Sequence, residues 1–265
     1  MKFGVCLGGV SRESIELASD SGADFIVANL YAISEYEPEK LREIIDISRS
    51  YGQKITATNG FFGKMPFFES PENYEKSADY VKRTFEKMAY TDIKFMTLGS
   101  GVHRHIPDGM AKEAAEEKYI KLCREVIAPE AANYGYTIGI EHLNKKEVNY
   151  INTALEAYEL VRKIDRPQIK MLVDYYHFML ENEVFEEFEK FGSCVAHMHI
   201  ASALNDRHLP LPVDGEAESY RKFFKAVKRY VDSDVDMAIE GGIPEPKVQN
   251  LRHSFHYLRK LRSES

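Results

Sequence analysis

The chain has 265 residues, of which 44% are hydrophobic and 29% are charged. This length allows one α/β barrel or two smaller domains, and the composition excludes an intrinsically disordered chain. The net charge of −7 and the pI of about 5.8 argue against a protein that coats nucleic acid, because phosphate contacts need Lys and Arg.

Short apolar runs alternate with longer amphipathic stretches from one end of the chain to the other. Several of the runs are apolar throughout their centres, which suits parallel strands that are covered on both faces. The strands are predicted at 3–7, 24–29, 54–59, 93–99, 137–142, 169–174, 195–200 and 236–241.

The stretches between the predicted strands carry helix start and stop signals. Pro38 stands in a first turn, Ser70 is an N-cap candidate, and Thr153 and Glu156 have capping-box spacing. Pro129 is expected to kink or divide the longest helix. The helices are predicted at 36–52, 70–90, 114–135, 153–165, 218–231 and 246–261.

Eight such βα units in 265 residues give about 33 residues each, the size expected of a TIM barrel. We therefore predict an α/β fold in which residues 1–265 form a single (β/α)8 TIM barrel domain. A doubly wound open sheet shows the same alternation, but its GxGxxG turn is missing after the first strand, where the chain reads "GGVSRES".

The cysteines and the apolar runs bear on localisation. Cys6, Cys123 and Cys194 stand far apart, and an odd number cannot form a complete disulfide framework, so we expect reduced thiols in the cytoplasm. The run "FGVCLGG" is too short for the core of a signal peptide, and no run approaches the ~18 apolar residues of a membrane helix. We expect neither a membrane nor a nucleic acid as a partner.

Chemically active residues stand at the ends of four successive predicted strands. Glu141 ends the fifth strand, Asp174 the sixth, His199 the seventh and Glu240 the eighth. The active sites of TIM barrels lie at this end of the strands, so the four side chains are expected to meet at one rim. His197 shares the strand face of His199 but lies deeper, and is expected to support the site or pack in the core.

Three carboxylates that meet at one place repel one another unless a proton or a cation intervenes. A set of carboxylates and one imidazole suits one divalent metal ion. We expect Mn²⁺, with Mg²⁺, Co²⁺ or Zn²⁺ as alternatives, and we expect Glu141, Asp174, His199 and Glu240 to be its ligands.

The segments "GIEHLNKKE", "LVDYYH", "HMHIA" and "AIEGG" resemble the xylose-isomerase-like TIM barrels, the superfamily of sugar isomerases and epimerases that also contains endonuclease IV. The likeness is greatest to the ketose 3-epimerases of the tagatose and psicose type, and "LGSGVHRHIPDG" resembles their strand-four loop. The specific motifs lie between residues 98 and 242, whereas the first three strands match by architecture only.

The resemblance implies an isomerase that acts on a small sugar and holds its metal with the same four side chains. Glu141 and Glu240 would serve as acid and base on opposite faces of the sugar, through a metal-stabilised enediolate. Glu147 and His177 would bind substrate hydroxyls, and Arg207 would correspond to a substrate-binding arginine. The segment "HIASALNDR" is two residues longer than expected of the epimerases, which leaves the role of Arg207 open.

Several reactions and functions are compatible with this metal site. Returning the proton to the same carbon gives epimerisation, returning it to the neighbouring carbon gives aldose–ketose isomerisation, and a dehydratase of sugar acids or polyols would use the same first step. A sugar-binding barrel without turnover is another alternative. An AP endonuclease like endonuclease IV is a further one, because Asp206 and His208 form an Asp-x-His string that could bind another metal, although a role in the loop or against the substrate is expected.

The loop "NGFFGKMPFFESP" is rich in phenylalanine and follows the third strand. Such an apolar loop is typical of a pocket lid or a subunit contact. Together with the resemblance, it favours a homo-oligomer, either a dimer or a tetramer.

Overall fold

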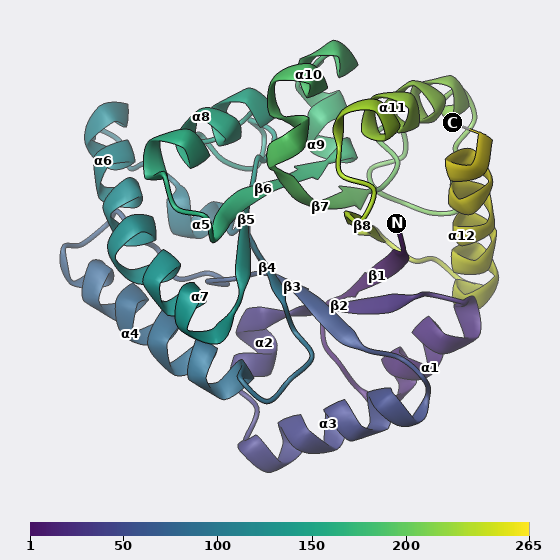
Figure 1. Ribbon diagram of the computed structural model, residues 1–265, viewed down its shortest axis with the longest axis horizontal. Coiled ribbons are helices and arrows are strands. Elements are labelled where there is room, and N and C mark those ends of the chain that lie inside the picture. Colours follow the sequence, from purple (N-terminus) through teal and green to yellow (C-terminus); the bar gives the residue numbers. More distant parts are fainter. Residues whose placement is uncertain (265) are drawn as a thin grey trace.

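The computed structural model describes residues 1–264, and its eight strands close into a barrel in chain order, from β1 to β8 and back to β1. Each strand pairs in parallel with both of its neighbours, and β8 pairs with β1. In Figure 1 the strands form the centre and the helices surround them. The prediction of a single (β/α)8 TIM barrel is confirmed.

The strands lie within two residues of the predicted bounds, because continuous apolar runs mark buried parallel strands clearly. Their bounds are β1 Phe3–Leu7, β2 Phe25–Asn29, β3 Ile55–Asn59, β4 Phe95–Leu98, β5 Thr137–Glu141, β6 Ile169–Asp174, β7 Val195–Ile200 and β8 Asp236–Ile239.

The helices follow the strands in turn, and some loops hold additional short ones. The α-helices are α1 Arg12–Ser21, α2 Leu30–Ser34, α3 Pro38–Ser50, α4 Glu72–Met88, α5 Gly101–Arg104, α6 Lys112–Leu122, α7 Ala128–Tyr134, α8 Ala154–Ile164, α9 Tyr175–Leu180, α10 Phe188–Phe191, α11 Ala217–Tyr230 and α12 Lys247–Glu264. A π-helical turn, Cys123–Ile127, and two 3₁₀ turns, Phe185–Glu187 and Gly192–Cys194, complete the set. Within residues 1–264, no helix is both long enough and apolar enough to cross a membrane.

The predicted helix at 114–135 is divided, as its proline suggested. Helix α6 ends at Leu122, the π-helical turn follows, and α7 begins immediately before Pro129. Proline has no backbone N–H to donate to the preceding turn, so the regular hydrogen-bond ladder cannot pass through it.

Side chains alternate along each strand between an outer core beneath the helices and a small cluster inside the barrel. Glycines in β1 and β5 make room for two of the inner rings: a Cβ at Gly4 would overlap Phe25, and one at Gly139 would overlap Phe95. The inner cluster consists of Phe25, Val27, Ala57, Phe95, Leu172 and Ala238, with Cys6 and Ala196 packed against it. This cluster forms the floor beneath the carboxyl ends of the strands.

The phenylalanines of the loop after β3 pack inside the chain. Phe61, Phe62, Phe67 and Phe68 are all buried, so their rings form no exposed apolar patch in residues 1–264. The ring of Phe62 stacks on that of His103 with 3.7 Å between centroids, which anchors the loop to the segment after β4. The sequence pattern showed an apolar loop but not which surface it covers. The homo-oligomer stays a prediction.

Candidate metal centre and active site

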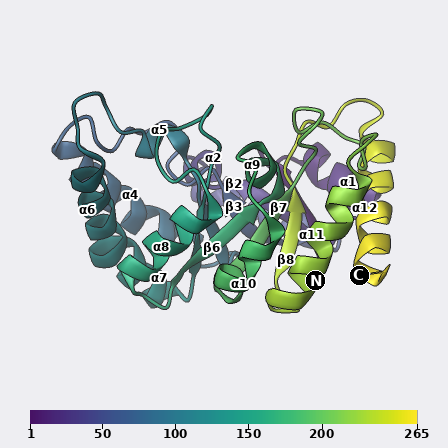
Figure 2. The same ribbon diagram turned by 90° about the horizontal axis from the view of Figure 1, so that it is seen from above.

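Two of the site residues lie two positions beyond members of the inner cluster, toward the carboxyl ends of the strands. Residues two apart on a strand share a face, so Asp174 follows Leu172 into the barrel mouth and Glu240 follows Ala238. Figure 2 shows the barrel from the side, with the loops that follow the strands forming its upper rim. The ligand atoms of the four predicted residues all lie within 4.8 Å of one another: Glu141, Asp174, His199 and Glu240.

Asp174 uses its two oxygens differently. It is the N-cap of α9, and its Oδ1 accepts a hydrogen bond of 2.7 Å from the backbone N–H of Tyr176. Its Oδ2 is buried and has no hydrogen-bond partner among residues 1–264. Burial raises the pKa of Asp174 to about 7. An unpartnered carboxylate oxygen in a buried place points to a ligand that supplies positive charge.

His199 directs one ring nitrogen at two carboxylates. Its Nδ1 lies 3.1 Å from Glu141 Oε1 and 3.0 Å from Glu240 Oε2. Burial alone would lower the pKa of His199, but the Glu240 carboxylate and the Cys6 side chain outweigh burial and raise it well above its ordinary value. The electrostatics of the pocket therefore favour positive charge between these side chains.

The pKa values of the two glutamates are shifted in opposite directions. Burial raises the pKa of Glu141, because an ionised carboxylate is poorly solvated there. Burial acts in the same direction on Glu240, but His199 and Arg207 favour its ionised form and hold its pKa well below the ordinary value. One carboxyl group is thus biased toward holding a proton and the other toward lacking one.

These residues fit a divalent cation. They offer three carboxylates and one imidazole nitrogen, a donor set that suits Mn²⁺, Mg²⁺, Co²⁺ or Zn²⁺. In the described chain, the one other group with the spacing of metal ligands shares His199 and Glu240 and adds Cys6. Asp206 and His208 belong to neither group: Asp206 accepts a bond of 3.2 Å from the Tyr176 hydroxyl, and the His208 ring lies against Gly242.

Two polar residues that sequence reasoning passed over hold the glutamates in place. The Asn59 amide at the end of β3 donates a bond of 2.5 Å to Glu240 Oε1. The buried guanidinium of Arg104 donates a bond of 2.6 Å to the backbone carbonyl of Glu141. Asn59 ends its strand, and the four predicted ligands stand at or next to the ends of theirs, so that position was the signal available. The contact of Arg104 depends on loop geometry.

Gly99 leaves the space that the Glu141 side chain occupies, since a Cβ at this position would overlap that carboxylate. The deeper His197 packs in the barrel interior, as expected, with its ring 4.8 Å from that of Phe95 and 5.5 Å from that of His199.

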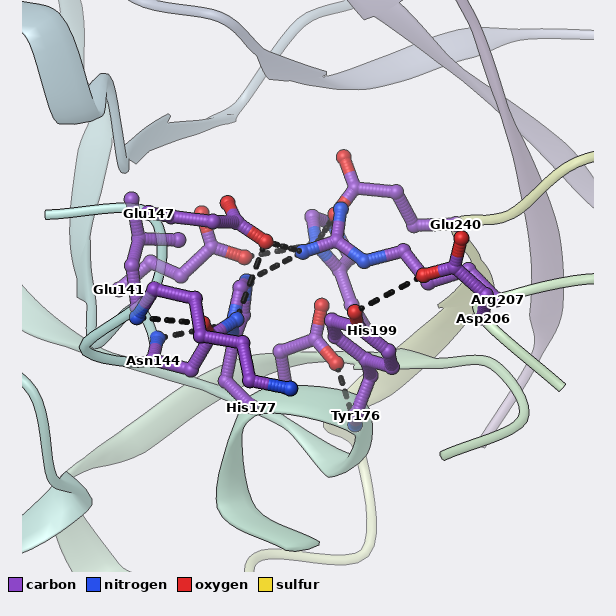
Figure 3. Close-up of polar contacts among 12 residues, drawn as sticks. Glu141, Asn144, Glu147, Tyr176, His177, His199, Asp206, Arg207 and Glu240 are labelled. Atoms are coloured by element: carbon purple, nitrogen blue, oxygen red, sulfur yellow. Dashed lines mark hydrogen bonds and ion pairs between the residues drawn. The ribbon is translucent and has the colours of Figure 1, made fainter. Parts of the chain in front are cut away.

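Arg207 reaches across the mouth of the barrel (Figure 3). Its Nη2 lies 2.9 Å from Glu147 Oε1 and 2.7 Å from His177 Nε2, and its guanidinium stacks over the ring of Tyr176 at 4.2 Å. The structure thus brings together the three residues predicted to bind substrate, beside the four predicted ligands. Asp206 and Arg207 both have positive φ values, 44° and 63°, a conformation that non-glycine residues adopt only when their surroundings impose it.

The two ring nitrogens of His177 have distinct environments. Burial lowers its pKa to about 2, and the nearby Arg207 acts in the same direction. Its Nδ1 accepts a bond of 3.0 Å from the backbone N–H of Asn144, whereas its Nε2 lies 2.7 Å from Arg207 Nη2. The ring is thus held between a backbone donor and the guanidinium at the mouth of the barrel.

Two adjoining cavities open above the cluster, with volumes of about 490 and 440 Å³. They share four polar lining residues, Asn59, Glu147, Arg207 and Glu240. A volume of this size holds a small polar molecule, and its polar lining suits one with several hydroxyl groups.

Comparison with known proteins gives concordant results. The sequence model of the xylose isomerase-like TIM barrel family matches residues 15–261. A D-psicose 3-epimerase from Agrobacterium fabrum is 26% identical over 204 residues, which cover 74% of this chain and 68% of the relative. A D-psicose 3-epimerase from Enterocloster bolteae is 24% identical over 168 residues, covering 61% of this chain and 55% of the relative.

Among solved structures, D-psicose 3-epimerase from Clostridium cellulolyticum H10, crystallised with D-tagatose, superposes with a TM-score of 0.81. The two chains are 16% identical, and the match covers 99% of each. At this identity the likeness establishes the fold.

Proposed function

Because the chain belongs to the xylose isomerase-like TIM barrel family, we propose that it is a divalent-metal-dependent sugar isomerase of the ketose 3-epimerase or aldose–ketose isomerase type. The curated relatives named above are sugar epimerases, which supports this reaction class. The observation that carries the proposal is the cluster of three carboxylates and one imidazole at the mouth of the barrel.

We assign the cation, with Mn²⁺ as the first choice, to Glu141, Asp174, His199 and Glu240. When bound, it supplies positive charge that stabilises negative charge developing on adjacent sugar oxygens. The ligand oxygens come from side chains fixed by other contacts: α9 holds Asp174, and Asn59 holds Glu240. Little reorganisation is then needed at the site when a substrate arrives.

Glu141 and Glu240 would carry the proton. A carboxylate within hydrogen-bond reach of a carbon acid can remove the proton next to a carbonyl, and a carboxylic acid can return it. The opposite biases of their pKa values suit a pair of which one member begins protonated and the other ionised. Both side chains also belong to the ligand set, which fixes their distance from any bound sugar.

Glu147, His177 and Arg207 would bind the sugar. In the structure Arg207 contacts both of the others, and each offers a polar group for a hydroxyl: a carboxylate acceptor, an imidazole nitrogen and the guanidinium donors. A sugar hydroxyl placed among these groups can accept from the guanidinium and donate to the carboxylate.

The test is turnover and deuterium exchange in D₂O with a panel of ketoses and aldoses, using protein of measured Mn²⁺ content. We expect deuterium at the epimerised or isomerised carbon. Glu141→Gln and Glu240→Gln, compared at equal metal occupancy, should each lower turnover by about 10²- to 10⁴-fold, because general acid–base catalysis contributes that much. Glu186→Gln, at an exposed glutamate, is the matched control. Near-normal turnover in either active-site variant would contradict its proton-transfer role.

We also expect the protein to work in the cytoplasm as a homo-oligomer, with neither a nucleic acid nor a membrane as partner. Light scattering coupled to size-exclusion chromatography measures the oligomeric state, and a monomer at micromolar concentration would contradict that expectation.

A further inference from the structure

We propose that Cys6 positions His199 by accepting a hydrogen bond from the ring nitrogen that faces away from the carboxylates. Cys6 stands near the carboxyl end of β1, and its Sγ lies 3.7 Å from His199 Nε2. The inference rests on the proposed function only in taking the cluster to be a cation site.

The two nitrogens of His199 have separate partners. Nδ1 faces Glu141 and Glu240 at about 3 Å, whereas Nε2 faces the sulfur of Cys6. A neutral imidazole has one lone pair and one N–H, so a cation bound through Nδ1 leaves the proton on Nε2. The side chain of His199 is fully buried, and this N–H must find its partner inside the protein.

The usual partner of a metal-bound histidine is a carboxylate, a backbone carbonyl or water, which fixes the tautomer and the orientation of the ring. Here the contact at Nε2 is a thiol. Cys6 packs against the inner cluster and also lines the larger cavity, so its sulfur lies between the apolar floor and the site. A sulfur acceptor is weaker than a carboxylate, which leaves the ring less basic than a carboxylate would.

Cys6, His199 and Glu240 also have the spacing of metal ligands, which raises the alternative of a sulfur-bound cation. The geometry favours the positioning role. The nitrogen nearest the sulfur is not the nitrogen nearest the carboxylates, so a cation held by Nδ1 and the glutamates binds a different ring nitrogen from the one that faces Cys6.

The experiment compares the wild type, Cys6→Ala, Cys6→Ser and Cys194→Ala. Cys194 is also partly exposed but lies in a turn just before β7, at the amino end of the barrel strands, and serves as the control. Calorimetric titration with Mn²⁺ alone gives the dissociation constant, and circular dichroism of the metal-free proteins checks the fold. We expect Cys6→Ala to weaken binding about 10- to 100-fold, as is typical when the partner of a metal ligand is lost. Cys6→Ser keeps an acceptor and should recover most of the affinity.

The following results decide whether Cys6 positions His199 and whether the proposed function holds. If Cys6→Ala binds Mn²⁺ as tightly as the wild type, Cys6 does not position His199. If the Co²⁺-loaded wild type shows a thiolate-to-cobalt charge-transfer band that Cys6→Ser lacks, Cys6 is a ligand and the positioning role is wrong. A wild type that binds no cation overturns this inference and the proposed function together. A wild type that binds Mn²⁺ but converts no sugar overturns the proposed function alone.

Discussion

Asp174 connects local structure to chemistry within one side chain. Its Oδ1 caps α9 by accepting a hydrogen bond from the N–H of Tyr176, and its buried Oδ2 has no partner in the part of the chain that the structure describes. A strand that runs directly into a helix needs a capping residue at the junction, and aspartate meets that need with one oxygen while the other remains available. This explains why an apolar strand ends in a carboxylate.

Asp174→Asn separates the two roles. Asparagine retains the capping oxygen but removes the charge, so the cation affinity should fall by about 100-fold or more, since even the partners of ligands contribute 10- to 100-fold. The metal-free variant should unfold at no lower denaturant concentration than the wild type at pH 8, where burial opposes the Asp174 carboxylate. Titration calorimetry and urea unfolding measure the two quantities.

Asp236→Asn is the control, because Asp236 starts β8 at the opposite end of the barrel and accepts from the backbone N–H of Lys2. Unchanged Mn²⁺ affinity in Asp174→Asn would show that Asp174 is not a ligand.

At the scale of elements, the alternation along strands made the cluster of proposed ligands predictable. Asp174, His199 and Glu240 could be placed at one rim because parallel strands end together, and this needed no knowledge of the loops. Cys6 and Asn59 stand at similar positions but are not carboxylates, so nothing marked them as part of the site. The contacts of Arg104 depend on how the segment after β4 folds back.

The helices likewise fall into those that the sequence predicted and those that it missed. The long helices were predicted from their apolar periodicity and their end signals, and Thr153 caps α8 as expected. The predicted cap Ser70 was wrong: the N-cap of α4 is Pro71, and this helix begins without a side-chain cap. Helix α1 was missed although Ser11 and Ser14 form its capping box, because its apolar positions are few. The short helices α2, α5 and α9 have too few residues for a periodic signal. The apolar loop after β3 was recognised, but its burial against His103 is a long-range contact that local sequence does not encode.

The start of α8 supplies a prediction of pH dependence. The Glu183 carboxylate accepts a bond of 2.8 Å from the N–H of Ala154 through Oε2, while Oε1 lies 3.5 Å from the buried His142 ring. Burial raises the pKa of Glu183 from 4.5 to about 8. The folded state therefore binds this proton more tightly than the unfolded state, and its stabilising contribution is complete below pH ~4.5 and is lost as the pH rises through about 8.

Glu183→Gln should remove this contribution, on the order of 4 kcal/mol across the interval. We expect the unfolding free energy of the variant, relative to that of the wild type, to increase from pH 5 to pH 8. Urea unfolding at several pH values measures it, with Glu186→Gln as the exposed control. A difference between variant and wild type that does not change with pH would contradict the raised pKa.

At the scale of the whole molecule, the site exists only when the barrel is closed. Its four proposed ligands come from β5, β6, β7 and the end of β8, and the backbone N–H of Glu240 donates a bond of 3.1 Å to the carbonyl of Ile200 in β7. A cation that binds these residues binds the folded chain and not the unfolded one, so binding and folding are linked.

Mn²⁺ should therefore raise the melting temperature, and a chelator should lower it. At 100 times the dissociation constant the linkage amounts to about 2.7 kcal/mol, or about 5 to 10 °C for a chain of this size. Differential scanning calorimetry across a Mn²⁺ series measures the shift, and Asp174→Asn should abolish most of it. A melting temperature that is insensitive to Mn²⁺, Mg²⁺, Co²⁺ and Zn²⁺ would contradict the linkage.

The most direct measurement is the anomalous difference density of a crystal grown with Mn²⁺, recorded at the manganese absorption edge. We predict one strong peak per chain, bound by Glu141, Asp174, His199 Nδ1 and Glu240. A peak bound by other residues, or no peak in a crystal saturated with Mn²⁺, would contradict the assignment of these four side chains to one cation.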